Sequence, residues 1–194
     1  CSVCPVLDLA GYPAVLDPKL KVDLRRARNK LDKNHRIAFS LATPETLPTA
    51  LEDFFRLHAA RWQSEGETGV LAEAALRNFH REVAAGFCER GLLRLYTLHI
   101  DGAAAAVIYA FRAHRTLFCY LSGFDPQFSK LSPGGVLLQH AVESAIAEGL
   151  TAVDFLRQPE AYKYLWGARD RINSRLRFPP SGMRNAESRE LPAS

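Results

Sequence analysis

Apolar residues recur at helical spacing in three segments of the first half of the chain. Residues 19–36, 43–63 and 70–89 each place them at steps of three and four, which is the spacing of one buried helix face. Between the first two helices, residues 36–42 alternate apolar and polar positions, as a strand with one buried face does. The positions that form these faces are Leu20, Leu24, Ala27 and Leu31; Ile37, Phe39 and Leu41; Leu47, Leu51, Phe54, His58 and Trp62; and Leu76, Phe79, Val83 and Phe87.

The spacing changes to that of strands in the centre of the chain. Residues 92–100, 103–112 and 116–124 are short apolar runs separated by turn residues. The dipeptide Asp101-Gly102, between the first two runs, is a strong signal for a two-residue hairpin turn. We therefore expect these three segments to form an antiparallel meander.

The last third of the chain predicts a crossover. Residues 133–148 have a helical pattern that Gly149 ends, and the apolar residues 151–156 follow directly. A strand, a helix and a strand joined this tightly form a parallel pair. A short helix over 159–167 and a last strand over 171–178 complete the order of elements. The fold class is therefore α/β (α+β), a mixed and mostly antiparallel sheet with helices on both faces and a parallel strand–helix–strand crossover.

The two ends of the chain differ in composition from the middle. Residues 1–18 contain three prolines and one glycine and keep no period, which predicts a connector from an upstream domain. Residues 179–194 are polar, contain proline and lack a period, which predicts a disordered tail. A chain of 194 residues, 47% of them hydrophobic, supports one core, which we place in a single domain over residues 19–178.

Composition excludes some classes of protein and leaves others open. No apolar run approaches the ~20 residues of a membrane span, and no signal-peptide pattern opens the chain. The net charge of +4 permits acidic partners without requiring them. Cys1 and Cys4 form a CxxC, but no second pair or histidine follows at the spacing of a zinc site. We expect no metal, and a reduced, cytoplasmic setting for the thiols.

The helix at 133–148 begins with an unusual run, Ser132-Pro133-Gly134-Gly135. Serine before proline is a typical helix start, but each glycine costs about 0.5 to 1 kcal/mol relative to alanine. A ligand that touches the main chain would explain that loss, and a helix N-terminus favours an anion. The start of this helix is therefore a candidate site for an anion. Close packing of the helix against a neighbour is the alternative.

The run "YLSGFDPQFSKLSPGGVLLQHAVESAIAEGLTAVDFLRQPEAYKYLWG", residues 120–167, resembles the GNAT superfamily of acyltransferases. More narrowly, it is similar to the FemAB-like and cellulose-biosynthesis (CelD-like) acetyltransferase group, in which proteins often contain two related halves. The resemblance covers residues 19–178 and fits the second, C-terminal half. It implies acetyl-CoA or another acyl-CoA as co-substrate, with its pyrophosphate on Ser132, Gly134, Gly135 and Val136.

The stretch 154–167 contains the groups that acyl transfer needs. Asp154 is expected at the carboxyl end of its strand, where a carboxylate accepts a proton or orients the acceptor, unless it only caps or forms an ion pair with Arg157. Lys163 would stabilise the oxyanion or hold a phosphate, as the resemblance implies, unless it is an exposed helix lysine.

The same resemblance implies a tyrosine that protonates the leaving thiolate. Tyr162 is preferred over Tyr164 because it precedes the lysine of the motif, although core packing explains either. Glu160 is a further carboxylate in reach of the same site and a second candidate for the base.

Three functions remain open. The first is transfer of an acyl group from acyl-CoA to an amine or hydroxyl, on a small molecule or a cell-envelope polysaccharide or its precursor. The second is a FemAB-like transfer from aminoacyl-tRNA to a peptidoglycan precursor, which would give the basic helix at 19–36 a task, although such a charge run is usually a solvated face. The third is a non-catalytic half-domain that binds or scaffolds beside an upstream GNAT-like half.

Overall fold

The computed structural model describes residues 2–174, which form a seven-stranded mixed sheet in the order β2-β3-β4-β5-β6-β1-β7. The elements in chain order are β1 (Ser2–Asp8), η1 (Leu9–Gly11), α1 (Pro18–Asn34), β2 (Ile37–Leu41), α2 (Leu47–Ser64), α3 (Ala74–Glu89), β3 (Leu93–Ile100), β4 (Ala103–Ala113), β5 (Thr116–Phe124), η2 (Pro126–Leu131), α4 (Pro133–Ala147), β6 (Ala152–Asp154), α5 (Ala161–Leu165) and β7 (Arg169–Asn173).

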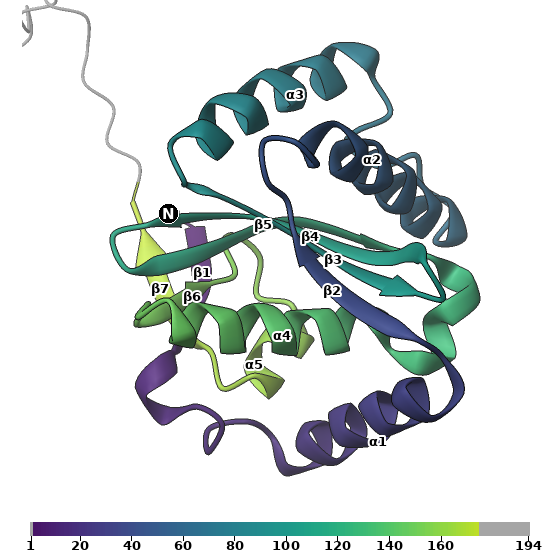
Figure 1. Ribbon diagram of the computed structural model, residues 1–194. Helices are drawn as coiled ribbons and strands as arrows, with labels where there is room; N and C mark the ends of the chain where they lie inside the picture. Colours follow the sequence, from purple (N-terminus) through teal and green to yellow (C-terminus); the bar gives the residue numbers. More distant parts are fainter. Residues whose placement is uncertain (1, 175–194) are drawn as a thin grey trace, which may run out of the picture.

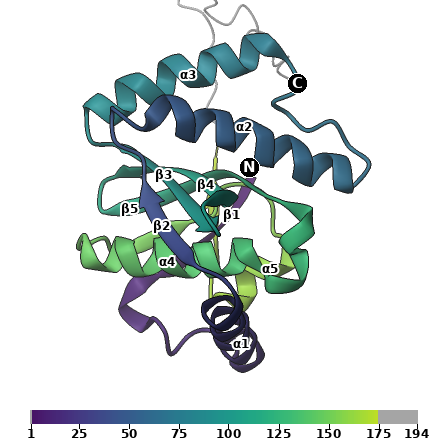
Figure 2. The same ribbon diagram turned by 45° about the vertical axis from the view of Figure 1, so that its right-hand side comes forward.

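Helices cover both faces of the sheet. Helices α2 and α3 lie on one face, and α1, α4 and α5 lie on the other, as both views show (Figure 1, Figure 2). Each face has its own apolar core, one that includes Leu137 and Val153 and one that includes Phe54 and Tyr109. The predicted mixed sheet with helices on both faces is confirmed. None of the helices among residues 2–174 has the length and apolar character needed to cross a bilayer.

The centre of the sheet is the expected antiparallel meander. Strands β3, β4 and β5 pair in sequence order, and β5 then pairs in parallel with β6 across the α4 crossover. Strand β5 contains a bulge, because Tyr109 faces Leu121 while Ala110 faces Cys119, which leaves Tyr120 as an extra residue. The parallel pairing covers only Thr116 to Phe118 before it stops.

The N-terminal segment corrects our expectation of a connector over residues 1–18. Ser2–Asp8 forms β1, which pairs antiparallel with β6 on one side and with β7 on the other. Cys4 and Leu7 are buried in it, so the strand lacks the simple alternation that marks a half-exposed strand. Pro5 lacks a backbone N–H donor, and proline is rare within strands, so its presence also argued against a strand here. The tail expected over residues 179–194 lies outside the described residues.

Helix α3 also differs from the expectation. Leu76 and Phe79, expected to face inward, are 39% and 55% exposed, whereas His80 and Ala84 are buried. The His80 ring packs edge-on against Tyr109, with 5.6 Å between ring centroids. The helix is therefore rotated so that His80 and Ala84 face the sheet and Phe87 packs on Phe111 of β4, while Leu76 and Phe79 lie outward.

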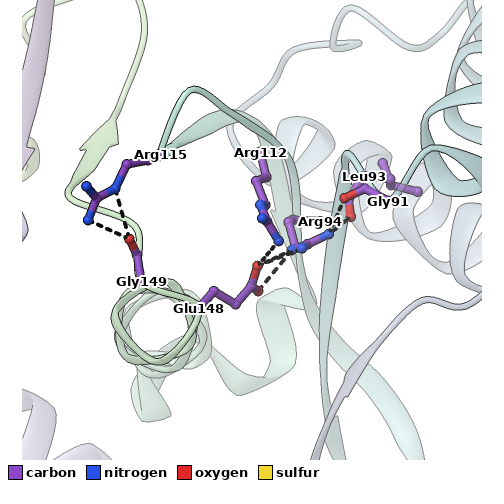
Figure 3. A network of polar contacts seen from close by, with 7 residues as sticks. All are labelled: Gly91, Leu93, Arg94, Arg112, Arg115, Glu148 and Gly149. Carbon is purple, nitrogen blue, oxygen red and sulfur yellow. Dashed lines mark hydrogen bonds and ion pairs between the residues drawn. The ribbon is translucent and has the colours of Figure 1, made fainter.

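An ion-pair network joins the end of α4 to the sheet (Figure 3). Arg94 of β3 donates from Nε and Nη2 to the Glu148 carboxylate at 2.9 and 2.6 Å, and its Nη1 donates to the carbonyls of Gly91 and Leu93. Arg112 of β4 adds a contact of 3.2 Å to the same carboxylate. Because Arg94 is almost fully buried, this bidentate pair fixes the C-terminal end of α4 against β3 and β4.

Helix α2 approaches β5 more closely than any side chain would allow at one point. A Cβ on Gly123 would lie 2.4 Å from the His58 backbone nitrogen and 2.5 Å from the Leu57 carbonyl carbon. Both atoms belong to the α2 backbone, which cannot move as a side chain can. Gly123 therefore sets the distance between α2 and β5.

We expect Gly123→Ala to lower the free energy of unfolding by about 3 kcal/mol, because the new methyl group would collide with helix backbone. Chemical denaturation measures this change. The matched control is Gly86→Ala in α3, where a Cβ meets nothing within 4 Å. That variant should gain about 0.5 to 1 kcal/mol. Equal effects of the two substitutions would show that the close approach at Gly123 is not a constraint.

Candidate active site

A cavity opens where β5 and β6 part. The two strands pair over three residues only, from Thr116 to Phe118 on β5, and the chain after β6 then turns away while β5 continues. The cavity between them has a volume of about 970 Å³. Its walls are residues 119–124 of β5, residues 155–158 after β6, and side chains from α1, α2, α4 and α5. Ligands bind at such points of divergence in open sheets.

Lys163 fixes the cavity wall that follows β6. Its side chain is buried, and Nζ donates to the carbonyls of Phe155, Arg157 and Gln158 at 3.0, 2.9 and 2.9 Å. Glu160 Oε2 lies 2.9 Å from the same Nζ and neutralises its charge. The alternative of an exposed helix lysine is wrong. The donors of Lys163 are used within the protein, which disfavours the predicted direct role in oxyanion or phosphate binding.

The loop that Lys163 holds is strained. Leu156 and Gln158 have φ values of 56° and 78°, in the left-handed region that residues other than glycine rarely adopt. Such strain is characteristic of sites where the surrounding structure fixes a conformation for function. Here the left-handed conformation of these two residues lets three backbone carbonyls point at the Lys163 ammonium.

The first turn of α4 reaches the cavity, as the glycine motif predicts. Gly134 and Gly135 line it, and as the second and third helical residues they have N–H groups with no carbonyl partner among the described residues. A Cβ on Gly134 would meet nothing within 4 Å, whereas one on Gly135 would lie 3.2 Å from Leu24 Cδ2 of α1. Close packing therefore explains Gly135, but it does not explain Gly134.

The other two members of the predicted cradle differ from our expectation. The Val136 N–H donates to the Ser132 carbonyl at 3.1 Å, and Val136 is buried outside the cavity, so this amide is not open to a ligand. Ser132 occupies the N-cap position and lines the cavity, but its side chain accepts no capping hydrogen bond. Its backbone is left-handed, with φ 48°, and its hydroxyl is exposed.

Asp154 ends β6, as predicted, but its side chain is not part of the cavity wall. The carboxylate accepts from the Leu156 N–H at 2.8 Å and forms an ion pair with Arg171 of β7, not with Arg157. Successive residues of a strand point to opposite faces, and it is the next residue, Phe155, that lines the cavity. This placement disfavours Asp154 as the base of a reaction in the cavity.

Of the two candidate tyrosines, Tyr162 lines the cavity and Tyr164 does not. Burial, and then the charge of Glu160, raise the pKa of Tyr162 well above its usual range, although 46% of the residue is exposed. Tyr164 instead donates to Asp170 Oδ1 at 2.7 Å, and this hydrogen bond raises its pKa. Both tyrosines therefore keep their protons, and Tyr162 is the one that lines the cavity.

The wall that α2 contributes was not predicted from the sequence. His58, Arg61 and Trp62 line the cavity from this helix, together with Tyr120 and Ser122 of β5. Their only sequence signal is the arrangement of His58, Arg61 and Trp62 within one helical turn, which is equally typical of a core helix. Gly123 brings this turn against β5.

His58 is buried and uncharged at neutral pH. Its Nε2 accepts a hydrogen bond from the Trp62 indole at 3.0 Å, which leaves the proton of the neutral ring on Nδ1. Burial lowers the pKa of His58 to about 4, with smaller contributions from Arg61 and His80. Its Nδ1 has no hydrogen-bond partner among residues 2–174.

The fold and cavity together define an α/β domain that offers a helix N-terminus to an anion beside the gap between two strands. A family model described as "Acetyltransferase (GNAT) domain" matches residues 18–164. The chain belongs to this family, and its domain is of the acyltransferase type. No curated protein matches the chain.

Solved structures with the same fold include FemX, with a TM-score of 0.66 and 11% identity over 87% of this chain. The C-terminal domain of a putative lysylphosphatidylglycerol synthetase from Agrobacterium fabrum has a TM-score of 0.61 and 12% identity over 87%. L-PGS from Bacillus licheniformis has a TM-score of 0.63 and 12% identity over 87%. The chain spans 57 to 59% of the length of these structures.

Metal ligands do not cluster in the described part of the chain. No group of three or more His, Cys, Asp or Glu side chains between residues 2 and 174 is arranged to hold a metal ion. Cys4 is buried in β1, where its Sγ accepts a hydrogen bond from Asn173 Nδ2 at 3.2 Å.

We expect Lys163→Met to lower the free energy of unfolding by about 3 kcal/mol, because three carbonyls would lose their donor. Chemical denaturation measures the loss, with the exposed Lys130→Met as the matched control, expected to be within about 0.5 kcal/mol of wild type. A stable Lys163→Met protein would contradict the structural role and would return this lysine to the candidates for direct catalysis.

Proposed function

We propose that this domain transfers an acyl group, acetyl in the simplest case, from acyl-CoA to an amine or hydroxyl of an acceptor. The observation that carries the proposal is the pair of unpaired N–H groups at Gly134 and Gly135, which open into a cavity that extends to Tyr162. Membership of the acetyltransferase (GNAT) family supports it.

The cavity fits the parts of an acyl-CoA. The pyrophosphate would lie on the amides of Gly134 and Gly135, where the positive end of the α4 dipole favours an anion. The pantetheine amides would pair with the backbone of β5 beyond Phe118, on the edge that β6 leaves. The Asp23 carboxylate also lines the cavity, and Arg26 lies 3.9 Å from it, which offsets part of its charge.

In this proposal Tyr162, which lines the cavity, supplies the proton that the reaction needs. In the transfer, the acceptor nitrogen or oxygen forms a bond to the acyl carbon, the carbon–sulfur bond breaks, and the thiolate takes a proton from the Tyr162 hydroxyl. Glu160 lines the same wall and replaces Asp154 as the carboxylate that takes the proton of the acceptor. Lys163 is a positioning residue, because it holds both Glu160 and the loop after β6 in place.

The proposal extends to the setting of the enzyme. A co-substrate of this type places the reaction in the cytoplasm. We retain a cell-envelope polysaccharide or its precursor as the acceptor class that the resemblance of residues 120–167 implies, and an upstream GNAT-like half-domain as the partner that would complete the acceptor site.

We expect Gly134→Leu to weaken CoA binding at least tenfold while the protein stays as stable as wild type or gains up to about 1 kcal/mol. The new side chain would project into open space above the amides. Isothermal titration with CoA and acetyl-CoA measures the affinity, and thermal unfolding measures stability. Gly86→Leu, on α3 and away from the cavity, is the control and should bind CoA as wild type does. Unchanged affinity in Gly134→Leu would refute the proposed phosphate site.

The basic face of α1 favours aminoacyl-tRNA as a second candidate donor. Leu20 and Leu24 of this helix line the cavity, so the helix runs along its mouth. Its exposed basic residues are Lys19, Lys21, Arg25, Arg26, Arg28, Lys30 and Lys33. Phosphate contacts dominate the affinity of proteins for nucleic acids, and a basic helix beside the donor cavity would supply them.

If tRNA is the donor, the triple variant Arg25→Gln/Lys30→Gln/Lys33→Gln should weaken tRNA binding and reduce the slope of log affinity against log salt by about 2 to 3. Fluorescence anisotropy between 50 and 200 mM salt measures both quantities, and Gly134→Leu should leave the slope unchanged. Absence of salt-sensitive tRNA binding by the wild type would eliminate this candidate. A protein that binds neither CoA nor tRNA would favour a non-catalytic half-domain.

A further inference from the structure

The cavity is open to both faces of the sheet. Gly134 and Gly135 line it from α4 on one face, and Arg61 and Trp62 line it from α2 on the other (Figure 1). Beyond Phe118, β5 has no neighbouring strand on the β6 side, so the cavity passes through the sheet beside it. If the acyl donor occupies the α4 side, the acceptor enters from the α2 side.

Arg61 presents unused hydrogen-bond donors on the α2 side. Its Nη1 donates to Ser122 Oγ at 3.2 Å, and its Nε forms an ion pair of 3.4 Å with Glu65, which lies outside the cavity wall. The guanidinium lies over the Trp62 ring, 5.6 Å from its centroid. A guanidinium has five N–H donors, so the planar group is oriented by Ser122 and Trp62 and keeps donors for a ligand.

Of the neighbouring groups, Ser122 can also donate. The His58 ring lines the cavity, but its Nδ1, which carries the proton because Nε2 accepts from Trp62, is buried and adds no donor there. Ser122 accepts from Arg61, which leaves the hydroxyl proton of Ser122 available. The α2 wall therefore offers donors to whatever binds there.

The cavity wall also contains a second arginine and two carboxylates. Arg157 is exposed at the mouth and has no side-chain hydrogen bond or ion pair among the described residues, while Lys163 fixes its backbone carbonyl at 2.9 Å. Of the carboxylates in the wall, Glu160 is paired with Lys163, and Asp23 comes from α1 on the opposite face. Arg61 therefore supplies a cation on the α2 side, offset in part by Glu65, and Arg157 supplies a second cation from the loop after β6.

We propose that the acceptor carries an anionic group, a carboxylate or a phosphate, close to its nucleophilic amine or hydroxyl, and that Arg61 binds this anion with Arg157 as the second cation. The inference rests on the proposed function, because it assigns the acceptor to the side that acyl-CoA leaves free. A guanidinium binds a carboxylate or phosphate through two parallel hydrogen bonds, which would orient the acceptor as well as hold it.

Matched amines test the inference. Phenylalanine is compared with phenylalaninamide, and glucosamine 6-phosphate with glucosamine, in protein saturated with CoA so that the α4 site is filled. Titration calorimetry measures binding, and release of free CoA from acetyl-CoA measures transfer. We expect the anionic member of at least one pair to bind at least tenfold more tightly than its neutral partner, and the pair that does so distinguishes a carboxylate from a phosphate.

Arg61→Gln should abolish this preference and lower kcat/KM for the anionic amine at least tenfold, while the affinity for CoA stays unchanged. The control is Arg90→Gln, which removes an exposed arginine outside the cavity and should change nothing. Equal binding of charged and neutral members, no binding of either anion at 10 mM, or an equal loss of CoA affinity in Arg61→Gln would each overturn the inference. If the wild-type protein does not bind CoA, the proposed donor is refuted instead. The anion titration would then be made without CoA.

Discussion

The buried ammonium of Lys163 is the interaction on which the cavity depends. An ammonium can be removed from water only when its donors and its charge are satisfied, and here three carbonyls and Glu160 do so. The carbonyls belong to the loop that follows β6, so Lys163 fixes the course of this loop, including its left-handed residues Leu156 and Gln158. This loop is one wall of the cavity, and the shape of the wall depends on that contact.

The two glycines of α4 are present for different physical reasons. Gly135 lets Leu24 of α1 pack against the first helical turn, whereas nothing in the described protein occupies the space above Gly134. The far end of the helix is fixed by the Glu148–Arg94 pair, which sets the direction of its axis (Figure 3). A helix held at one end and open at the other presents its amides at a fixed place, which is what binding of a charged donor requires.

Local patterns in the sequence predicted most of the fold and several of the residues that line the cavity. The meander, α4 and the crossover could be inferred because hairpin and helix signals act over a few residues. Strand β1 could not, because its partners β6 and β7 lie at the other end of the chain. Asp154 was misplaced because neighbours in a short strand face opposite sides. Arg61 was missed because only the close approach of α2 at Gly123 brings it to the cavity.

The site separates two ways of binding negative charge. On the α4 side, backbone amides and a helix dipole bind an anion with partial charges, and on the α2 side Arg61 would bind one with a full charge. Strand β5 lies between them, so an anionic donor and an anionic acceptor could occupy the cavity together without competing for the same group. The uncharged parts of the donor and the acceptor would then meet in the gap beside β5, next to Tyr162. The acyl group would be transferred from the donor to the acceptor at that point.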